Sequence, residues 1–206
     1  MKTITRLASA LAIVACSSAA TAGRTDGWVP LFDGRTLDGW RASENPATFS
    51  VQNGEIVVHG PRAHLFYDGP VMNHDFRDFE LKADVLTRPG ANSGIFIRTE
   101  YQPSDWPSKG YEVQVNNSFA QDWRRTGSLY AVRDIREAGR DDTWFTIHTI
   151  VRGRRVQIFV DDRQLVDYTE PEGSPTRLTG GTIALQGHDP GSEVHYRNIM
   201  IRPLGR

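Results

Sequence analysis

Hydrophobic and polar residues alternate along several short stretches of this chain. Between Phe79 and Val85, apolar residues occupy every second position and charged residues fill the positions between them. Successive side chains of a β-strand point to opposite faces of a sheet, so this pattern predicts a strand with one buried face. The segments NSGIFIR (92–98) and YEVQV (111–115) alternate in a similar way. These segments therefore predict strands, and two of them carry polar side chains along a whole face.

Turn residues separate further strand-like segments. Asn53–Gly54 lies between two apolar runs, which predicts a hairpin, and residues 144–168 predict three strands joined at Gly153 and at Asp161–Asp162. Residues 180–188 and 193–204 predict two more strands. Helical patterns are weak, with the best candidates for a turn or two of helix at 105–110 and 141–144. The fold class that follows is all-β, an antiparallel two-sheet sandwich.

The chain reads as one folded domain, residues 27–204, with three long irregular segments. These segments are 102–110, 118–127 and 134–142, and loops of that length in a sandwich are usually functional or flexible. Of the 206 residues 38% are hydrophobic, enough for a normal core. The formal net charge is -1 and no basic stripe is present, which argues against nucleic-acid binding.

The N-terminus predicts an export signal. Lys2 and Arg6 precede the short apolar segment LASALAIVA, and the small residues before Gly23 suit cleavage after Ala22, giving a signal peptide of residues 1–22. Alternatively, IVAC resembles a lipobox, in which Cys16 is lipidated and becomes the first residue. The apolar segment is too short to span a bilayer, which needs about 20 residues. We expect an exported protein without a membrane span, either periplasmic or anchored to the outer membrane as a lipoprotein.

Cysteine and histidine usage limits the chemistry. Cys16 is the single cysteine, so its removal would leave no thiol. No histidine pair has the HxH or HExxH spacing of a metal site. His59 and His64 lie near the predicted hairpin end and the loop after it, and are weaker candidates for function. A hard cation such as calcium remains possible, bound through oxygen atoms of Glu112, Gln114 and Asn116 together with loop carbonyl groups.

An ordered set of segments carries a family resemblance. The set consists of LFDGRTLDGW, FELKADV, NSGIFIR, YEVQV, TGSLYAV, TWFTIHTIVRGRRVQIFVDD and GTIALQGHDPGSEVHYRNIMI. Together they resemble the 3-keto-disaccharide hydrolase family across nearly the whole chain after the signal. The resemblance implies a concanavalin-A-like jelly roll, export from a bacterium, and hydrolysis of glycosides already oxidised to a ketone at C3.

In such a jelly roll, one face of a sheet packs in the core and the other can hold a sugar. The apolar positions assigned to the core are Ile95, Ile97, Tyr111, Val113 and Val115. The opposite face then carries a polar cluster from four strands, made up of Arg98, Glu112, Gln114, Tyr130, Gln186 and His188. Trp106 and Trp123 lie in the long loops, where their rings could stack on a sugar.

The reaction expected at this cluster is an elimination. The paired-carboxylate motif ExDxxE of retaining glucanases is absent. A ketone at C3 acidifies the C2 proton, so one base and one group that stabilises the enolate oxygen suffice. We expect His188 to be the base and Arg98 the enolate-stabilising cation, while Gln114, Gln186 and Tyr130 hold hydroxyl groups. Glu112 is the alternative base, or it orients His188 or a bound cation.

Two other functions remain open from the sequence. A lectin-like carbohydrate-binding module would use the same groove and aromatic residues without chemistry. A structural or adhesion domain on a lipid anchor would need no pocket. The convergence of Arg98, Glu112 and His188 in one pocket is the feature that would favour the enzyme.

Overall fold

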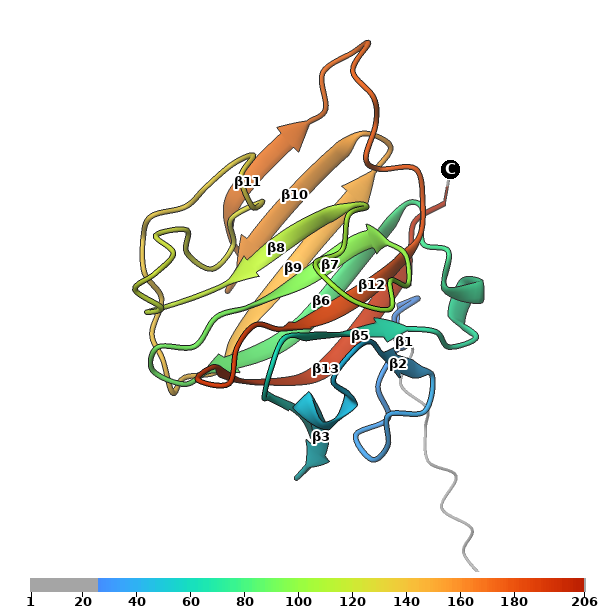
Figure 1. The fold of residues 1–206 in the computed structure, drawn as a ribbon. Coiled ribbons are helices and arrows are strands. Elements are labelled where there is room, and N and C mark those ends of the chain that lie inside the picture. Colours follow the sequence, from blue (N-terminus) through green and yellow to red (C-terminus); the bar gives the residue numbers. More distant parts are fainter. Residues whose placement is uncertain (1–25, 206) are drawn as a thin grey trace, which may run out of the picture.

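Two antiparallel sheets pack face to face in the computed structural model, which describes residues 26–205 (Figure 1). The predicted signal peptide, including the alternative lipidation site Cys16, lies outside the described residues. Within residues 26–205, no helix is long and apolar enough to cross a membrane.

The large sheet has eight strands in the order β11-β10-β9-β6-β13-β4-β3, with β1 paired to β13. Its strands are β1 (Val29–Pro30), β3 (Phe49–Gln52), β4 (Glu55–His59), β6 (Phe79–Thr87), β9 (Phe145–Arg152), β10 (Arg155–Val160), β11 (Arg163–Thr169) and β13 (Glu193–Pro203). The small sheet has the order β2-β5-β12-β7-β8. Its strands are β2 (Trp40–Ala42), β5 (Ala63–Tyr67), β7 (Ser93–Thr99), β8 (Tyr111–Val115) and β12 (Thr182–Gly187).

The predicted hairpins are confirmed. β3 and β4 are joined at Asn53–Gly54, whose φ angles of 52° and 83° are those of a tight turn with two left-handed residues. β9, β10 and β11 follow one another antiparallel, joined at Gly153 and at Asp161–Asp162. Strand β12 and strand β13 are the last two strands predicted.

The predicted helical turns at 105–110 and 141–144 are wrong. Short 3-10 turns instead occupy η1 (Pro46–Thr48) and η2 (Val71–His74). In the segment after β7, the Gln102 side-chain amide bonds the main-chain oxygens of Ser104 and Trp106. These bonds hold the segment in an irregular loop, because they satisfy backbone groups that a helix would otherwise pair.

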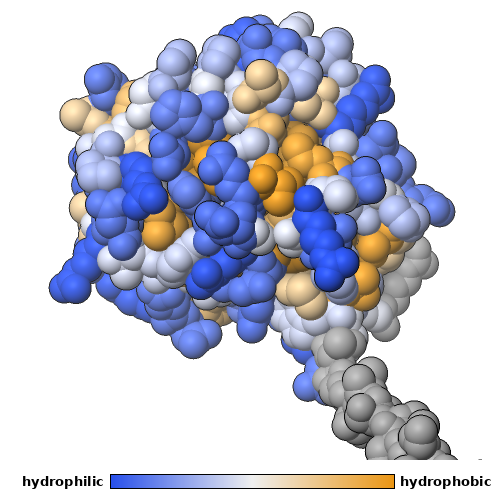
Figure 2. All heavy atoms as spheres, turned by 90° about the horizontal axis from the view of Figure 1, so that it is seen from below, coloured by the Kyte–Doolittle hydropathy of each residue, from blue (hydrophilic) through white to orange (hydrophobic). Residues whose placement is uncertain are grey.

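The inner faces of the two sheets form one core, as the alternation predicted. Ile95, Val113 and Leu185 from the small sheet are fully buried, and so are Ile147 and Ile201 from the large sheet. Hydrophilic residues divide the apolar surface into separate patches on the side seen from below (Figure 2). The architecture is the predicted jelly-roll sandwich, and it leaves the other face of the small sheet, here called the outer face, free to carry a site.

Candidate functional site

A cavity of about 320 Å³ opens on the outer face of the small sheet. Its lining residues are Asn92, Phe96, Trp106, Pro107, Glu112, Gln114, Asp122, Tyr130, Arg177, Gln186 and His188. The volume is in the range of small-ligand sites. Six of the eight predicted site residues lie here, and two, Arg98 and Trp123, do not.

Glycine at position 94 gives Glu112 its place in the cavity. Glu112 lies on β8 and Gln186 on β12, with β7 running between these two strands. A Cβ atom on Gly94 of β7 would overlap Oε1 of Glu112 and lie 2.8 Å from its Cγ. Because that space is empty, the Glu112 side chain crosses β7, and Nε2 of Gln186 donates a hydrogen bond of 2.8 Å to its Oε1.

Glu112 is an acid rather than a carboxylate at neutral pH. Burial raises the pKa of Glu112 to about 8, although the hydrogen bond from Gln186 lowers it, and the charge of Asp122 raises it further. A protonated carboxyl group donates a hydrogen bond, which a carboxylate cannot do. Glu112 can therefore hold a developing oxyanion on a ligand in this cavity.

His188 is oriented by the residue that follows it. Its Nδ1 lies 2.8 Å from Oδ2 of Asp189, and the Asp189 carboxylate also accepts hydrogen bonds from Gly191 N and Ser192 Oγ. Burial opposes ionisation of Asp189, but these bonds together lower its pKa. A carboxylate on Nδ1 favours the tautomer with the proton there, so Nε2 carries the lone pair. The ring packs against Trp106, with centroids 5.4 Å apart.

Two amide oxygens in the cavity have no partner among the described residues. Gln114 donates from Nε2 to Oδ1 of Asn92 at 3.1 Å, which leaves Oε1 of Gln114 unpaired. Oε1 of Gln186 is likewise buried and unpaired. Buried polar atoms are normally hydrogen-bonded, so these two acceptors suit hydroxyl groups of a ligand. The hydroxyl-binding role expected for both glutamines stays a prediction.

Loop residues complete the cavity wall. Tyr130 lies under the guanidinium of Arg124, 4.6 Å from its ring centroid, and Asp122 pairs with the same guanidinium at 3.3 Å. Arg177 contributes a cation to the lining and packs on Tyr111 at 4.3 Å. Of these residues, sequence reasoning identified only Tyr130, since the others follow strand ends where no alternation exists to place them.

The prediction that Arg98 faces the groove is wrong. Thr182 pairs with Thr99 and Ala184 with Phe96, so two steps on β12 match three on β7, and Arg98 in this bulge has φ of 50°. A bulge reverses the alternation of side chains, since it inserts one extra residue. The buried guanidinium bonds the main-chain oxygens of Gly153, Leu178 and Arg77, and pairs with Asp78 at 3.0 Å. Arg98 thus ties segments of the fold together and does not line the cavity, so of the three residues expected to converge in one pocket only Glu112 and His188 do so.

Trp123 also lies away from the cavity lining. Its ring carries the guanidinium of Arg136 at 3.9 Å and that of Arg124 at 4.9 Å. The residue is 41% exposed. These contacts place it on the outside of the 118–127 loop, so the expectation that it walls the groove is corrected.

The segment expected to offer calcium ligands is used differently. Oδ1 of Asn116 accepts from Phe119 N and from Arg125, and its Nδ2 donates to main-chain oxygens of the following loop. Across residues 26–205, no group of three or more His, Cys, Asp or Glu side chains is placed to hold a metal ion. Asn116 is thus a loop anchor.

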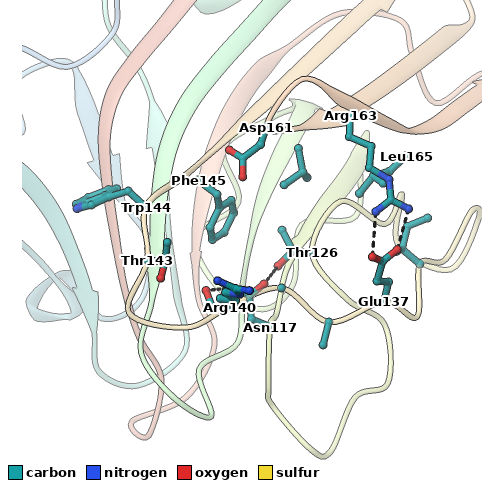
Figure 3. Close-up of a pocket in the computed structure, with 14 residues that line it drawn as sticks. Asn117, Thr126, Glu137, Arg140, Thr143, Trp144, Phe145, Asp161, Arg163 and Leu165 are labelled. Atoms are coloured by element: carbon teal, nitrogen blue, oxygen red, sulfur yellow. Dashed lines mark hydrogen bonds and ion pairs between the residues drawn. The ribbon is translucent and has the colours of Figure 1, made fainter.

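A second cavity, of about 510 Å³, lies between the 135–143 loop and strands β9 to β11 (Figure 3). Apolar side chains such as Ile135, Phe145 and Leu165 form much of its wall. At its rim Arg163 binds Glu137 through two hydrogen bonds of 2.9 and 2.8 Å, which lower the pKa of Glu137. The lining of this cavity contains no histidine, so the smaller cavity is the candidate site.

The fold and the cavity define a jelly-roll protein with a candidate site on the outer face of the small sheet. Residues 27–202 match the family described as the 3-keto-alpha-glucoside-1,2-lyase-like domain, and the chain belongs to that family.

Three relatives illustrate this likeness. The chain is 33% identical over 78 residues to a 3-keto-disaccharide hydrolase of Bacteroides thetaiotaomicron, a match that spans 34% of this chain and 27% of that protein. A crystal structure from Parabacteroides distasonis, provisionally assigned as a glycosyl hydrolase, has a TM-score of 0.72 at 20% identity, covering 87% of this chain and 95% of that one. The carbohydrate-binding module CBM66 of Bacillus subtilis has a TM-score of 0.61 at 14% identity, covering 80% and 95%. The two structures share the fold.

Proposed function

We propose that this protein cleaves 3-keto-glycosides by removing the C2 proton, eliminating the C1 substituent and adding water. The observation that carries the proposal is that one cavity holds both an oriented histidine and a buried carboxyl group. Nδ1 of His188 is bound to Asp189, and Glu112 is held by Gln186 at 2.8 Å. Membership of the family supports the substrate class.

The elimination requires one base for the C2 proton and one hydrogen-bond donor for the enolate oxygen. Nε2 of His188 takes the proton from C2, and the C–H electrons form a C2–C3 double bond as the ketone oxygen becomes an enolate. The carboxyl proton of Glu112 stabilises that oxygen, the role that the sequence assigned to Arg98. The ketone then re-forms, a C1–C2 double bond appears, and the C1 oxygen substituent leaves with the proton carried by His188.

Water completes the reaction. Its oxygen adds to C1 and a proton returns to C2, with His188 as the base for the water, so the net change is hydrolysis. Gln114 and Gln186 hold sugar hydroxyl groups through their unpaired Oε1 atoms. Arg177 supplies a positive charge at the cavity wall, which favours an electron-rich intermediate. We further propose that the enzyme acts after export, as the predicted signal peptide implies.

The test uses the mature chain with 3-keto-trehalose, 3-keto-sucrose and a 3-keto-glucoside beside their unoxidised parents. We expect cleavage of the keto sugars alone, and losses of about 100-fold or more in kcat for His188→Ala and about 10-fold or more for Glu112→Gln, whose amide remains a weaker donor. Near-full turnover by both variants would refute the roles assigned. Cleavage of the parents alone would refute the elimination.

A non-catalytic carbohydrate-binding module is the second candidate. The exposed ring of Trp106 at the cavity, 41% accessible, favours sugar stacking whether or not chemistry follows. In that case the parent sugars bind and no sugar is cleaved, so the same incubation, read by product analysis and by calorimetry, separates the two functions.

A further inference from the structure

His64 is a fully buried histidine whose ring nitrogens have no partner among residues 26–205. β5 places it on the outer face of the small sheet, with Gln186 of β12 as its cross-strand neighbour. The residue is 0% exposed, and neither Nδ1 nor Nε2 has a hydrogen bond within the described part of the chain. Burying a polar group without a hydrogen-bond partner costs free energy. A ligand that pairs with His64 would offset this cost.

Aromatic rings surround His64 and separate it from the cavity. Phe96 lies beside it with ring centroids 5.4 Å apart, and Trp106 lies against it at 5.5 Å. Trp106 also packs on His188 at 5.4 Å. The Trp106 ring therefore stands between the two histidines, as the wall that ends the cavity on the β5 side.

The contacts that hold the Trp106 ring in place are partly exposed ion pairs and a cation–π contact. Arg62 pairs with Glu44 at 3.0 Å and with Asp105 at 3.1 Å, and all three side chains are partly exposed. The Arg62 guanidinium also lies 5.4 Å from the Trp106 ring. Exposed ion pairs contribute little to stability, and Trp106 is 41% exposed, so part of its surface already faces solvent.

We propose that the Trp106 ring is a movable wall, and that His64 is a binding residue in the cavity that opens when this ring moves. The ligand group is a hydroxyl of the second sugar ring of a disaccharide, beyond the ring that lies between Glu112 and His188. The inference rests on the proposed function, since it takes the ligand to be a sugar.

The chemistry of a neutral imidazole suits this role. Burial lowers the pKa of His64 to about 4, so the ring is uncharged at neutral pH and offers one donor and one acceptor. A sugar hydroxyl also offers both. Replacing His64 with phenylalanine would remove this pair and keep the ring packed against Phe66 and Phe96, the apolar neighbours on its own face.

The experiment compares a 3-keto-disaccharide with a methyl 3-keto-glucoside, which has no second ring. We expect His64→Phe to raise KM for the disaccharide about tenfold, with kcat and the methyl glycoside KM unchanged. The control is His59→Phe, because His59 is an exposed histidine of β4 in the large sheet, and it should change neither substrate. Equal effects of His64→Phe on both substrates, or none, would overturn the inference and leave the proposed function intact.

A second measurement needs neither catalysis nor a variant. Histidine ring signals of isotope-labelled wild-type protein are followed by NMR as unoxidised trehalose or sucrose is added. We expect the His64 signals to shift together with those of His188. Shifts confined to His188 would overturn the inference. This readout also decides the matter if the wild type cleaves no keto sugar, in which case the proposed function fails separately.

Discussion

Substituting Gly94 with alanine would displace Glu112 without removing any group from the cavity. The new Cβ would lie 2.8 Å from Cγ and 2.9 Å from Cδ of Glu112. Carbon atoms pack at about 3.5–4.0 Å, so the Glu112 carboxyl must move by roughly 1 Å. The φ angle of Gly94 lies outside the left-handed region, so alanine adds no backbone strain. The three atoms nearest to the new Cβ all belong to Glu112, so the substitution acts first on that side chain.

A shift of about 1 Å in a catalytic group can cost about 100-fold in rate, or about 2.7 kcal/mol of activation free energy. We expect Gly94→Ala to lower kcat on a 3-keto-glucoside by that order. Stability should change by less than about 1 kcal/mol, because the Glu112 side chain can turn into the cavity instead of overpacking the core. The assay is steady-state turnover beside urea unfolding of the same preparation.

Gly205→Ala is the matched control. Nothing lies within 4 Å of a Cβ atom at Gly205, and its φ angle is also outside the left-handed region. The double variant Gly94→Ala with Glu112→Gln should be no slower than the slower single variant, since both changes act on one group. Turnover of Gly94→Ala within twofold of wild type would refute the position assigned to Glu112.

Four further predictions concern Arg98, Asp189 and Glu112. Arg98→Met should destabilise the fold by about 3–5 kcal/mol in urea unfolding, because Asp78 keeps only its bond from Gly153 N and three carbonyl groups lose the guanidinium. The kcat of the folded protein should be nearly unchanged, and a stable variant without activity would contradict this. Asp189→Asn should lower kcat about 10- to 100-fold with KM unchanged, because His188 loses its tautomer, whereas an unchanged kcat would count against the pair. The kcat/KM profile should fall as pH rises through about 8, where Glu112 loses its proton, and Glu112→Gln should remove this fall. Since the folded-state pKa of Glu112 is raised from 4.5, its contribution to stability is present below pH 4.5 and is lost as pH rises through about 8, which unfolding of wild type against Glu112→Gln would measure.

The alternation of side chains was enough to predict most strands and the inner faces. Ile95, Val113 and Leu185 are in the core because one face of each strand must be buried. The alternation of apolar and polar residues in the sequence shows which face that is. The Asn53–Gly54 and Asp161–Asp162 turns were also visible, since these residue types tolerate positive φ angles. Glu112, Gln114, Gln186 and His188 followed from the same rule applied to the opposite face.

The alternation of side chains could not place residues where a bulge interrupts it, or where both faces of a strand are buried. Arg98 was misplaced because a bulge in β7 has no signature in NSGIFIRTE that separates it from a regular strand. The burial of His64 could not be predicted either, because both faces of β5 are buried and AHLFY shows no alternation between an inner and an outer face. Arg177 lies in a loop, where its approach to the cavity depends on tertiary contacts far away in the sequence.

The central claim is that bond cleavage at C1 begins with proton removal at C2. A 3-keto-glucoside deuterated at C2 tests it directly, by comparing its turnover with that of the undeuterated sugar under identical conditions. The account predicts slower turnover of the deuterated sugar, and a larger slowing in Asp189→Asn, where His188 is a poorer base. Equal rates for the two sugars in both wild type and Asp189→Asn, with cleavage still occurring, would contradict it.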